Sequence, residues 1–438
     1  MKLDVYVNNQ LAGVLEQTDL TRFVFTYVPT AQDCVSLLMP VRTESWVHEG
    51  GLHPVFQVSL PEGALRAVLE RQFAKYFDRF GDMALLSSVG AHLIGRLRIA
   101  PHGQPLNTDS PADGLDTLLN IDGKGLLDRF LEMRAAYSGV SGGFPKALAK
   151  SPTGMSAGAA TDGHATMIFD RWIVKAGSPD TPALAANEYW GMRLAQNVGL
   201  DVPEFRLSAN GDRLLVRRFD VDDAGQALGF EDMCALAGLP ASAKFSGSVE
   251  RIVKTLNEMC PPQEAARARE AFCLQYLTCL AMRNGDAHMK NFGLLYDDAR
   301  SARLSPAYDM VSMSAYAPRR EDGDVEDMPA LTFGGVRRWP TEKTVKALAT
   351  RCLVGTSRLK TLRAQLVDGF VLTARALHTA CADGQLDAAL ARRLLEMWSS
   401  GLRIHDHEAA QQLMDMAHGV EIEPEMASVY VKPARQRY

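Results

Sequence analysis

Residues Asn284–Phe292 read NGDAHMKNF, and they join two segments whose apolar residues follow different periods. Before them, Glu264–Arg283 has the apolar spacing of a long helix, and after them the run up to Tyr296 resembles a β-strand. The sequence therefore predicts a helix, a polar loop and a strand in succession. Asp286 and Asn291 stand five residues apart in that loop, which lets one side chain face an acceptor group while the other faces a metal ion.

The spacing Asp-x-x-x-x-Asn is that of the protein-kinase catalytic loop. Phosphoryl transfer needs mainly positioning and charge neutralisation, so Asp286 is the candidate for holding the acceptor hydroxyl. Asn291 and Asp309 are the candidate magnesium ligands, because Mg²⁺ prefers oxygen donors. Asp309 follows Asn291 by eighteen residues, and a strand or hairpin between them would bring both to one ion. The bare spacing is also typical of Asp and Asn that only cap turns.

Strand patterns dominate the first half of the chain. Residues 2–8 alternate in the β manner and, with 12–15, predict a hairpin, while Phe23–Val28 predicts a third strand. Apolar positions then take helical spacing over residues 63–86. A stretch rich in Pro, Gly, Asp and Asn at residues 101–114 is the first linker that we expect.

A second strand-bearing region follows the linker, and helices dominate the rest. We predict an α+β, two-lobed, protein-kinase-like fold, with a mixed α/β N-terminal lobe that includes a small subdomain, and a mainly helical C-terminal lobe. The expected domains are 1–110, 111–225 and 226–438. The segments behind this prediction are strands at 167–169, 172–175 and 214–216, and helices at 185–198, 264–283, 341–351, 358–379 and 386–401.

Composition limits the classes of function. The chain has 438 residues, a formal net charge of −5 and a mean hydropathy of −0.10, which gives no general attraction to nucleic-acid phosphates. The N-terminus lacks the pattern of a signal peptide, and no run of about 18 apolar residues predicts a membrane span. The seven cysteines form no Cys-x-x-Cys pair. We therefore expect a cytoplasmic protein with reduced thiols and no membrane contact.

Taken whole, the loop motif resembles the signature of the HipA family of bacterial toxin kinases. In that family T-D-G-H-x-K-N-F is followed by P-x-Y-D; here G-D-A-H-M-K-N-F is followed by Pro306–Asp309, and Ala287 stands where Gly is usual. The resemblance covers nearly the whole chain in the same order. The further segments that match are LLSSVG at 85–90, WIVK at 172–175, NEY at 187–189, GLDVP at 199–203, LVRRFD at 215–220, EDMC at 231–234 and GLP at 238–240.

The resemblance implies an ATP site. Lys175 would contact the α- and β-phosphates, and Glu188 would either orient Lys175 or only balance the N-terminus of its helix. Backbone atoms of Arg217 and Phe219 would meet the adenine edge, and Asp220 the ribose.

The glycine-rich segment Ser138–Lys146, SGVSGGFPK, corresponds to the family's phosphate-binding loop, which carries an autophosphorylated serine. Gly139 stands at the first serine position of the family pattern, and Phe144 replaces its Gln. Ser141 is therefore the candidate autophosphorylation site, with Ser138 as the alternative. The backbone of this loop would approach the phosphates through Val140, Ser141, Gly142 and Gly143.

The predicted function is an ATP- and Mg²⁺-dependent serine/threonine protein kinase, with His288 either contacting the phosphate or bracing the loop. The resemblance implies a toxin of a HipBA-like toxin–antitoxin system that phosphorylates itself and a translation component such as an aminoacyl-tRNA synthetase. A HipB-like helix-turn-helix antitoxin would supply the DNA contacts. Two alternatives stay open: a small-molecule kinase of the aminoglycoside-phosphotransferase type, and a weakly catalytic subunit of a repressor complex.

Overall fold

The computed structural model describes residues 1–73, 80–106, 115–121, 165–169, 171–177, 181–222, 224–319 and 325–422. The chain divides into two compact units and passes between them more than once. The first unit comprises Met1–Pro179, Leu215–Lys244 and Gly293–Arg303, and the second comprises Asp180–Leu214, Phe245–Phe292 and Leu304–Tyr438.

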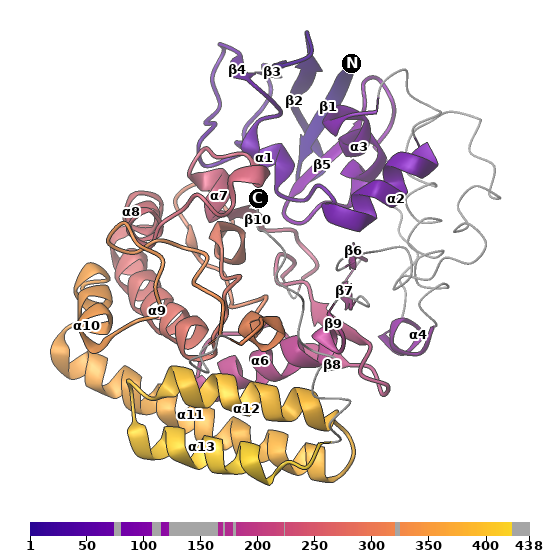
Figure 1. Cartoon of the computed structure of the whole chain (residues 1–438). Coiled ribbons are helices and arrows are strands. Elements are labelled where there is room, and N and C mark those ends of the chain that lie inside the picture. The colour runs from indigo at the N-terminus through magenta and orange to yellow at the C-terminus, as the bar shows by residue number, and fades with distance from the viewer. Residues whose placement is uncertain are drawn as a thin grey trace. The chain divides into compact units, whose positions relative to one another are not determined.

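The first unit opens with an antiparallel five-stranded sheet of order β4-β3-β2-β1-β5 (Figure 1). Asn8 and Asn9, both at positive φ, form the turn between β1 and β2, a conformation that Asn tolerates. The predicted hairpin and third strand are confirmed. The strands are β1 (Lys2–Val7), β2 (Gln10–Gln17), β3 (Arg22–Tyr27), β4 (Trp46–Glu49) and β5 (Leu97–Pro101).

The described part of the first unit also contains the short helices α1 (Pro54–Gln57), α2 (Gly63–Phe73), α3 (Asp82–Val89) and α4 (Leu115–Asn120). Helical spacing was predicted over residues 63–86, and the structure has two helices there, α2 and α3, the second of which begins at Asp82. Gly81 precedes it with extended backbone, at φ −146° and ψ −167°, which no continuous helix can contain. Apolar spacing alone did not reveal this break.

Two further groups of strands belong to the first unit. β6 (Ala165–Ile168) pairs antiparallel with β7 (Trp172–Ala176), and β9 (Arg213–Arg217), which enters this unit at Leu215, is the next strand of that sheet. β10 (Gly229–Asp232) pairs antiparallel with β11 (Gly293–Tyr296), followed by β12 (Arg303–Leu304), and α7 (Met233–Leu236) follows β10 directly. The strands predicted around Met167, Trp172, Leu214 and Leu294 are confirmed.

The second unit is mainly helical. Its elements are α6 (Leu184–Val198), β8 (Phe205–Leu207), α8 (Val249–Met259), α9 (Pro262–Ala281), α10 (Glu342–Arg351), α11 (Thr356–Ala382), α12 (Ala388–Leu402) and α13 (His407–Gly419). The predicted helices are confirmed, with Gly199 closing α6 at φ 85°. Two helices went unpredicted, α8 and α13. Ser248 and Asp406 cap their first turns by accepting bonds from the backbone N–H groups of Arg251 and Ala409.

Close packing holds the C-terminal end of α9, where the polar loop begins. α11, α12 and α13 lie side by side, and α12 also contacts α9 (Figure 1). A Cβ on Gly401 of α12 would lie 1.9 Å from the carbonyl oxygen of Ala281, so only glycine permits this approach. Trp398 is fully buried beside Phe370 and donates its indole N–H to Ser312 Oγ at 2.8 Å.

The predicted α+β class, with an N-terminal β-sheet subdomain and a helical C-terminal region, is confirmed. The domain boundaries near residues 110 and 225 stay predictions. Among the described helices, none has the length and apolar character that a membrane crossing requires.

Candidate functional site

The loop after α9 is turned tightly by its own polar groups. Arg283 adopts a left-handed conformation at φ 58° and ends the helix. Asn284 Oδ1 accepts the backbone N–H of Asp286 at 3.0 Å, and Asp286 O accepts the N–H of His288 at 2.7 Å. These bonds fix the backbone on both sides of Asp286, whose side chain is partly exposed. A carboxylate held in this way is available to an acceptor hydroxyl.

The structure brings the two predicted metal ligands together. Asn291 is 4% exposed; its Oδ1 accepts the N–H of His288 at 3.0 Å, and its Nδ2 donates to Asp309 Oδ2. Eighteen residues separate the two, and β11 and β12 lie between them in the chain. Asn291 and Asp309 belong to the second unit, so their proximity is a feature of one compact body.

Asp309 is held in an unusual backbone conformation. Its φ is 58°, in the left-handed region that Asp tolerates better than most residues but still at a cost. Asn284 Nδ2 lies 3.5 Å from the Asp309 carbonyl oxygen, and the Tyr308 hydroxyl donates to Lys290 O at 2.7 Å. The neighbouring residue thus ties the Asp309 segment to the loop that carries Asp286. Non-glycine residues held at such φ values concentrate at functional sites.

A second segment closes against the same loop. A Cβ on Gly285 would lie 2.0 Å from an Asp327 carboxylate oxygen, so a side chain at position 285 would force the Asp327 carboxylate to move. Asp327 is 8% exposed, accepts the Ser314 hydroxyl at 2.8 Å, and accepts the Trp339 indole N–H at 3.0 Å through its backbone carbonyl.

The chemistry of Asn291 and Asp309 suits magnesium. The described residues contain no cluster of three or more His, Cys, Asp or Glu that could hold a metal ion. One carboxylate and one amide oxygen are nevertheless the few protein ligands that Mg²⁺ uses when phosphates and water complete its shell. Cys279 lies nearby but is no competing thiolate ligand, because burial and the charge of Asp309 raise its pKa to about 12.

His288 is buried, at 6% exposed, and its ring meets Phe245 edge-on with 5.1 Å between centroids. Its backbone N–H contacts both Asp286 and Asn291. This geometry supports the bracing role, and the phosphate contact stays a prediction.

Lys175, Arg217, Phe219 and Asp220, which are predicted to bind the nucleotide, lie in the first unit. Lys175 is on β7, opposite Thr166 of β6, and is partly buried beside the fully buried Val174. Arg217 ends β9, and Phe219 follows it with its ring 5.6 Å from that of Phe230. Phe219 is thus anchored beside the strand pair β10–β11.

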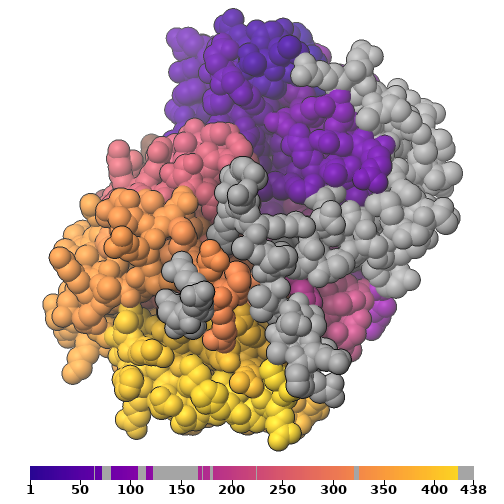
Figure 2. Space-filling view, viewed as in Figure 1, coloured from indigo at the N-terminus to yellow at the C-terminus, as the bar shows by residue number. Residues whose placement is uncertain are grey.

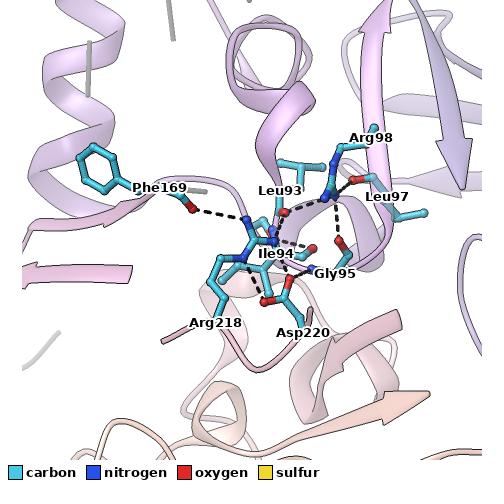
Figure 3. A network of polar contacts seen from close by, with 9 residues as sticks. Leu93, Ile94, Gly95, Leu97, Arg98, Phe169, Arg218 and Asp220 are labelled. Carbon is cyan, nitrogen blue, oxygen red and sulfur yellow. Dashed lines mark hydrogen bonds and ion pairs between the residues drawn. The ribbon is translucent and has the colours of Figure 1, made fainter. Parts of the chain in front are cut away.

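The carboxylate of Asp220 is engaged within the protein (Figure 3). Arg218 donates to it from Nε at 3.0 Å and from Nη2 at 2.5 Å, and the Gly95 N–H donates at 2.6 Å. Asp220 is 1% exposed; burial raises its pKa, but the charge and hydrogen bonds of Arg218 and Gly95 outweigh burial, so its pKa lies below the ordinary value. The ribose contact of Asp220 stays a prediction, and this geometry supports a structural role.

The same network joins the segment after β9 to the N-terminal subdomain. Arg218 Nη2 donates to Leu93 O at 2.9 Å, and Arg98 donates to Gly95 O at 2.8 Å, as Figure 3 shows. Sequence reasoning missed Arg218. The sequence signal for Arg218 was its position between Arg217 and Phe219, whose backbone is predicted to bind adenine. The partners of Arg218, such as Leu93, lie far away in sequence.

A second buried carboxylate was also missed. Glu231 accepts the Ser36 hydroxyl at 2.6 Å, the Leu37 N–H at 2.8 Å and the Tyr296 hydroxyl at 2.8 Å. Burial raises its pKa more than these three donors lower it. Arg96 lies over the Tyr296 ring at 4.9 Å. This cluster ties the N-terminal subdomain to β10 and β11.

The remaining predictions concern residues that the structure does not describe, and Glu188. Val140, Ser141, Gly142 and Gly143 fall outside the described residues. Glu188 is the fifth residue of α6 in the second unit and is 2% exposed, so it lies beyond the first turn of that helix.

Comparisons with known proteins agree with the motif. The family model of the HipA-like C-terminal domain matches residues 138–374, more than half of the chain, and the model of the HipA N-terminal domain matches residues 3–100. The proposed kinase Y4mE of Sinorhizobium fredii is 30% identical over 334 residues, covering 72% of this chain and 78% of that protein. The proposed kinase Y4dM of the same organism is 26% identical over 300 residues, or 65% of this chain and 66% of that protein.

A solved structure shares the fold. HipA from the Shewanella oneidensis MR-1 toxin–antitoxin complex with HipB and operator DNA has a TM-score of 0.64 and 17% identity, over 96% of this chain and 100% of that chain. At this identity the likeness concerns the fold alone. The domain matches, the relatives and the fold agree, and the chain therefore belongs to the HipA-like kinase family.

Proposed function

We propose that this chain is an ATP- and Mg²⁺-dependent serine/threonine protein kinase. The observation that carries the proposal is the pairing of Asn291 with Asp309 beside a loop whose hydrogen bonds fix Asp286. Family membership adds the expectation of a kinase. In this proposal Asp286 would serve the acceptor hydroxyl, and Asn291 and Asp309 would serve a phosphate-bound cation.

In the proposed reaction, Asp286 accepts the proton of a serine or threonine hydroxyl as its oxygen bonds to the γ-phosphorus. The bond from that phosphorus to the bridging oxygen breaks, and ADP leaves with the electron pair. Lys175 contacts the α- and β-phosphates, and the backbone of Arg217 and Phe219 meets the adenine. Asn291 and Asp309 would hold Mg²⁺, which would supply positive charge against the phosphates.

The biological setting is proposed from the family and the solved relative. The chain would act as the toxin of a HipBA-like system, bound by a HipB-like antitoxin through which operator DNA is contacted. Its target would be a translation component such as an aminoacyl-tRNA synthetase, and Ser141 its own acceptor.

The test is phosphate transfer by Asp286→Asn with labelled ATP, followed by phosphopeptide mapping. Transfer to protein should fall by about 10²–10⁴-fold, because the acceptor proton has no base. Asp383→Asn, an equal change at an exposed position after α11, should keep full activity. Full transfer by Asp286→Asn would reject the mechanism. Phosphate appearing only on an added aminoglycoside would favour a small-molecule kinase, and absence of Mg-ATP binding by calorimetry would favour a repressor subunit.

A further inference from the structure

A large groove lies in the second unit, apart from the loop of Asp286. Its volume is about 1180 Å³, and it is lined by the C-terminal half of α9, the loop Leu331–Thr341, α10 with the residues after it, and Glu250 of α8. α10 and the loop before it lie at the surface of the second unit (Figure 2). The volume exceeds the upper end of ordinary small-molecule sites, about 1,000 Å³, and suits a peptide segment.

The loop wall of the groove is held rigidly. Phe333 and Val336 exchange backbone hydrogen bonds across a turn formed by Gly334 and Gly335, both at positive φ. The Gly334 N–H donates to Glu250 Oε1 of α8 at 2.8 Å. The wall is therefore formed before any ligand arrives, which lowers the entropic cost of binding.

The same wall connects to the catalytic loop. Arg283, three residues before Asp286, stacks its guanidinium 4.7 Å from the Trp339 ring, and Trp339 donates its indole N–H to Asp327 O. A segment bound against Trp339 would therefore contact the ring that Arg283 stacks on, three residues before Asp286.

Apolar side chains line the interior and reach the rim. Leu331, Val345 and Leu348 are buried, whereas Val336 is 50% and Leu353 72% exposed. Single exposed apolar residues are ordinary on a protein surface, but two on the rim of one apolar groove are typical of an interaction site.

Most of the charged residues that line the groove are basic. Arg338, Lys343 and Arg351 line it, and Glu250 is the one acidic residue among the lining residues that the structure describes. Glu250 accepts the Gly334 N–H, whereas the three cations lie on exposed residues. The chain as a whole carries a net charge of −5, so this basic rim opposes the average charge of the protein. A basic rim around an apolar interior complements a segment that is acidic on one face and apolar on the other.

We propose that this groove docks an acidic, amphipathic segment of the protein that the kinase phosphorylates. The inference rests on the proposed function, since it names how that kinase engages its protein substrate. Docking would raise transfer to other proteins without taking part in the chemistry at Asp286.

The experiment compares two variants with reversed charges. The rim variant, Lys343→Glu/Arg351→Glu, reverses the charge of two of the three basic residues on the rim. The control pair, Lys360→Glu/Arg403→Glu, makes the same change at exposed residues in α11 and after α12. Both are expressed in bacterial cells beside wild type and Asp286→Asn, and phosphorylated sites on other proteins are quantified by mass spectrometry. ATP turnover of each purified chain is measured separately.

The rim variant should reduce phosphorylation of other proteins about tenfold or more while its ATP turnover stays at the wild-type rate, because like charges now face the acidic segment. The control pair should change neither. Leu353→Asn should weaken phosphorylation of other proteins too, and it should fold well, because position 353 has φ 58°, which Asn tolerates.

Unchanged phosphorylation of other proteins by the rim variant would overturn the docking proposal and leave the kinase proposal standing. A wild-type chain with no Asp286-dependent phosphorylation would overturn both. If sedimentation showed a dimer that the rim variant alone dissolves, a second copy of this chain would be the occupant, and the substrate-docking proposal would fail.

Discussion

At the scale of single residues, the site depends on side chains whose amide and carboxylate groups each have a defined partner. Asn291 accepts the His288 N–H through Oδ1 and donates to Asp309 through Nδ2, so its amide orientation is set by the loop and the acid together. Asp220 is engaged as fully, by Arg218 and Gly95. The difference is exposure: Asp309 is partly exposed, whereas Asp220 is 1% exposed.

Asp309→Asn should weaken magnesium binding. The variant loses the one negative charge of the proposed ligand pair, so the Mg²⁺ concentration for half-maximal phosphate transfer should rise about tenfold or more. The measurement is a magnesium titration at saturating ATP. Asp383→Asn, far from the pair in sequence and exposed, is the control. An unchanged half-maximal concentration would remove Asp309 from the metal site.

A separate prediction concerns Asp220. Asp220→Asn leaves the buried Arg218 charge without its partner, so we expect a loss of about 3–5 kcal/mol in unfolding free energy, measured by urea titration. The carboxylate is fully engaged, so wild type should bind ATP and 2′-deoxy-ATP with similar affinity. A strong preference for ATP that Asp220→Asn abolishes would instead establish the ribose contact.

At the scale of elements, α9 leads into the loop that carries Asp286, and α12 packs against the end of α9. Gly401 lies against the Ala281 carbonyl, at the last residue of α9. Three residues later Asn284 begins the hydrogen bonds that turn the loop. The contact of α12 with α9 thus fixes where the loop starts.

Gly401→Ala should therefore lower stability and activity together. The added methyl would lie 1.9 Å from a backbone oxygen that cannot move alone, so we expect a loss of about 1–3 kcal/mol in unfolding free energy. Gly355→Ala, where a Cβ meets nothing within 4 Å and φ is −69°, is the matched control. Equal unfolding midpoints for the two variants would show that the α9–α12 contact is not tight.

At the scale of the whole molecule, burial of ionisable groups makes stability depend on pH. His53 precedes α1, is 4% exposed and contacts Trp46 O through Nε2 at 3.0 Å. Burial lowers its pKa to about 4, against an ordinary value of 6.5. The unfolded chain therefore binds a proton between these values that the folded chain does not. The stability due to His53 is complete above pH 6.5 and is lost as the pH falls toward 4.

We expect the unfolding free energy of the wild type to fall by about 2 kcal/mol more than that of His53→Gln between pH 7.5 and pH 5. Urea titrations at both pH values measure the difference. His418→Gln, a change at an exposed residue, should follow the wild type. If the unfolding free energies of wild type and His53→Gln changed equally with pH, folding would not lower the pKa of His53.

The sequence by itself determined the local elements and the central motif. The β1–β2 hairpin follows from alternation ended by Asn8 and Asn9, and the close of α6 from Gly199, because such signals act over a few neighbouring residues. Asp286 and Asn291 were likewise found by spacing within one loop. The extended backbone at Gly81 was missed, since the helical apolar spacing continues across this residue.

Only the tertiary structure decided which distant residues meet. Asp220 contacts Gly95 across 125 positions, and Ser36 contacts Glu231 across 195. The groove combines α9 with a loop more than fifty residues later in the chain. Periodicity and turn residues carry information about the next few positions only, whereas these contacts arise when packing buries a charge that then needs a partner. For the same reason, the sequence placed Asp286 and Asn291 in one loop, and the fold brought Asp309 to Asn291.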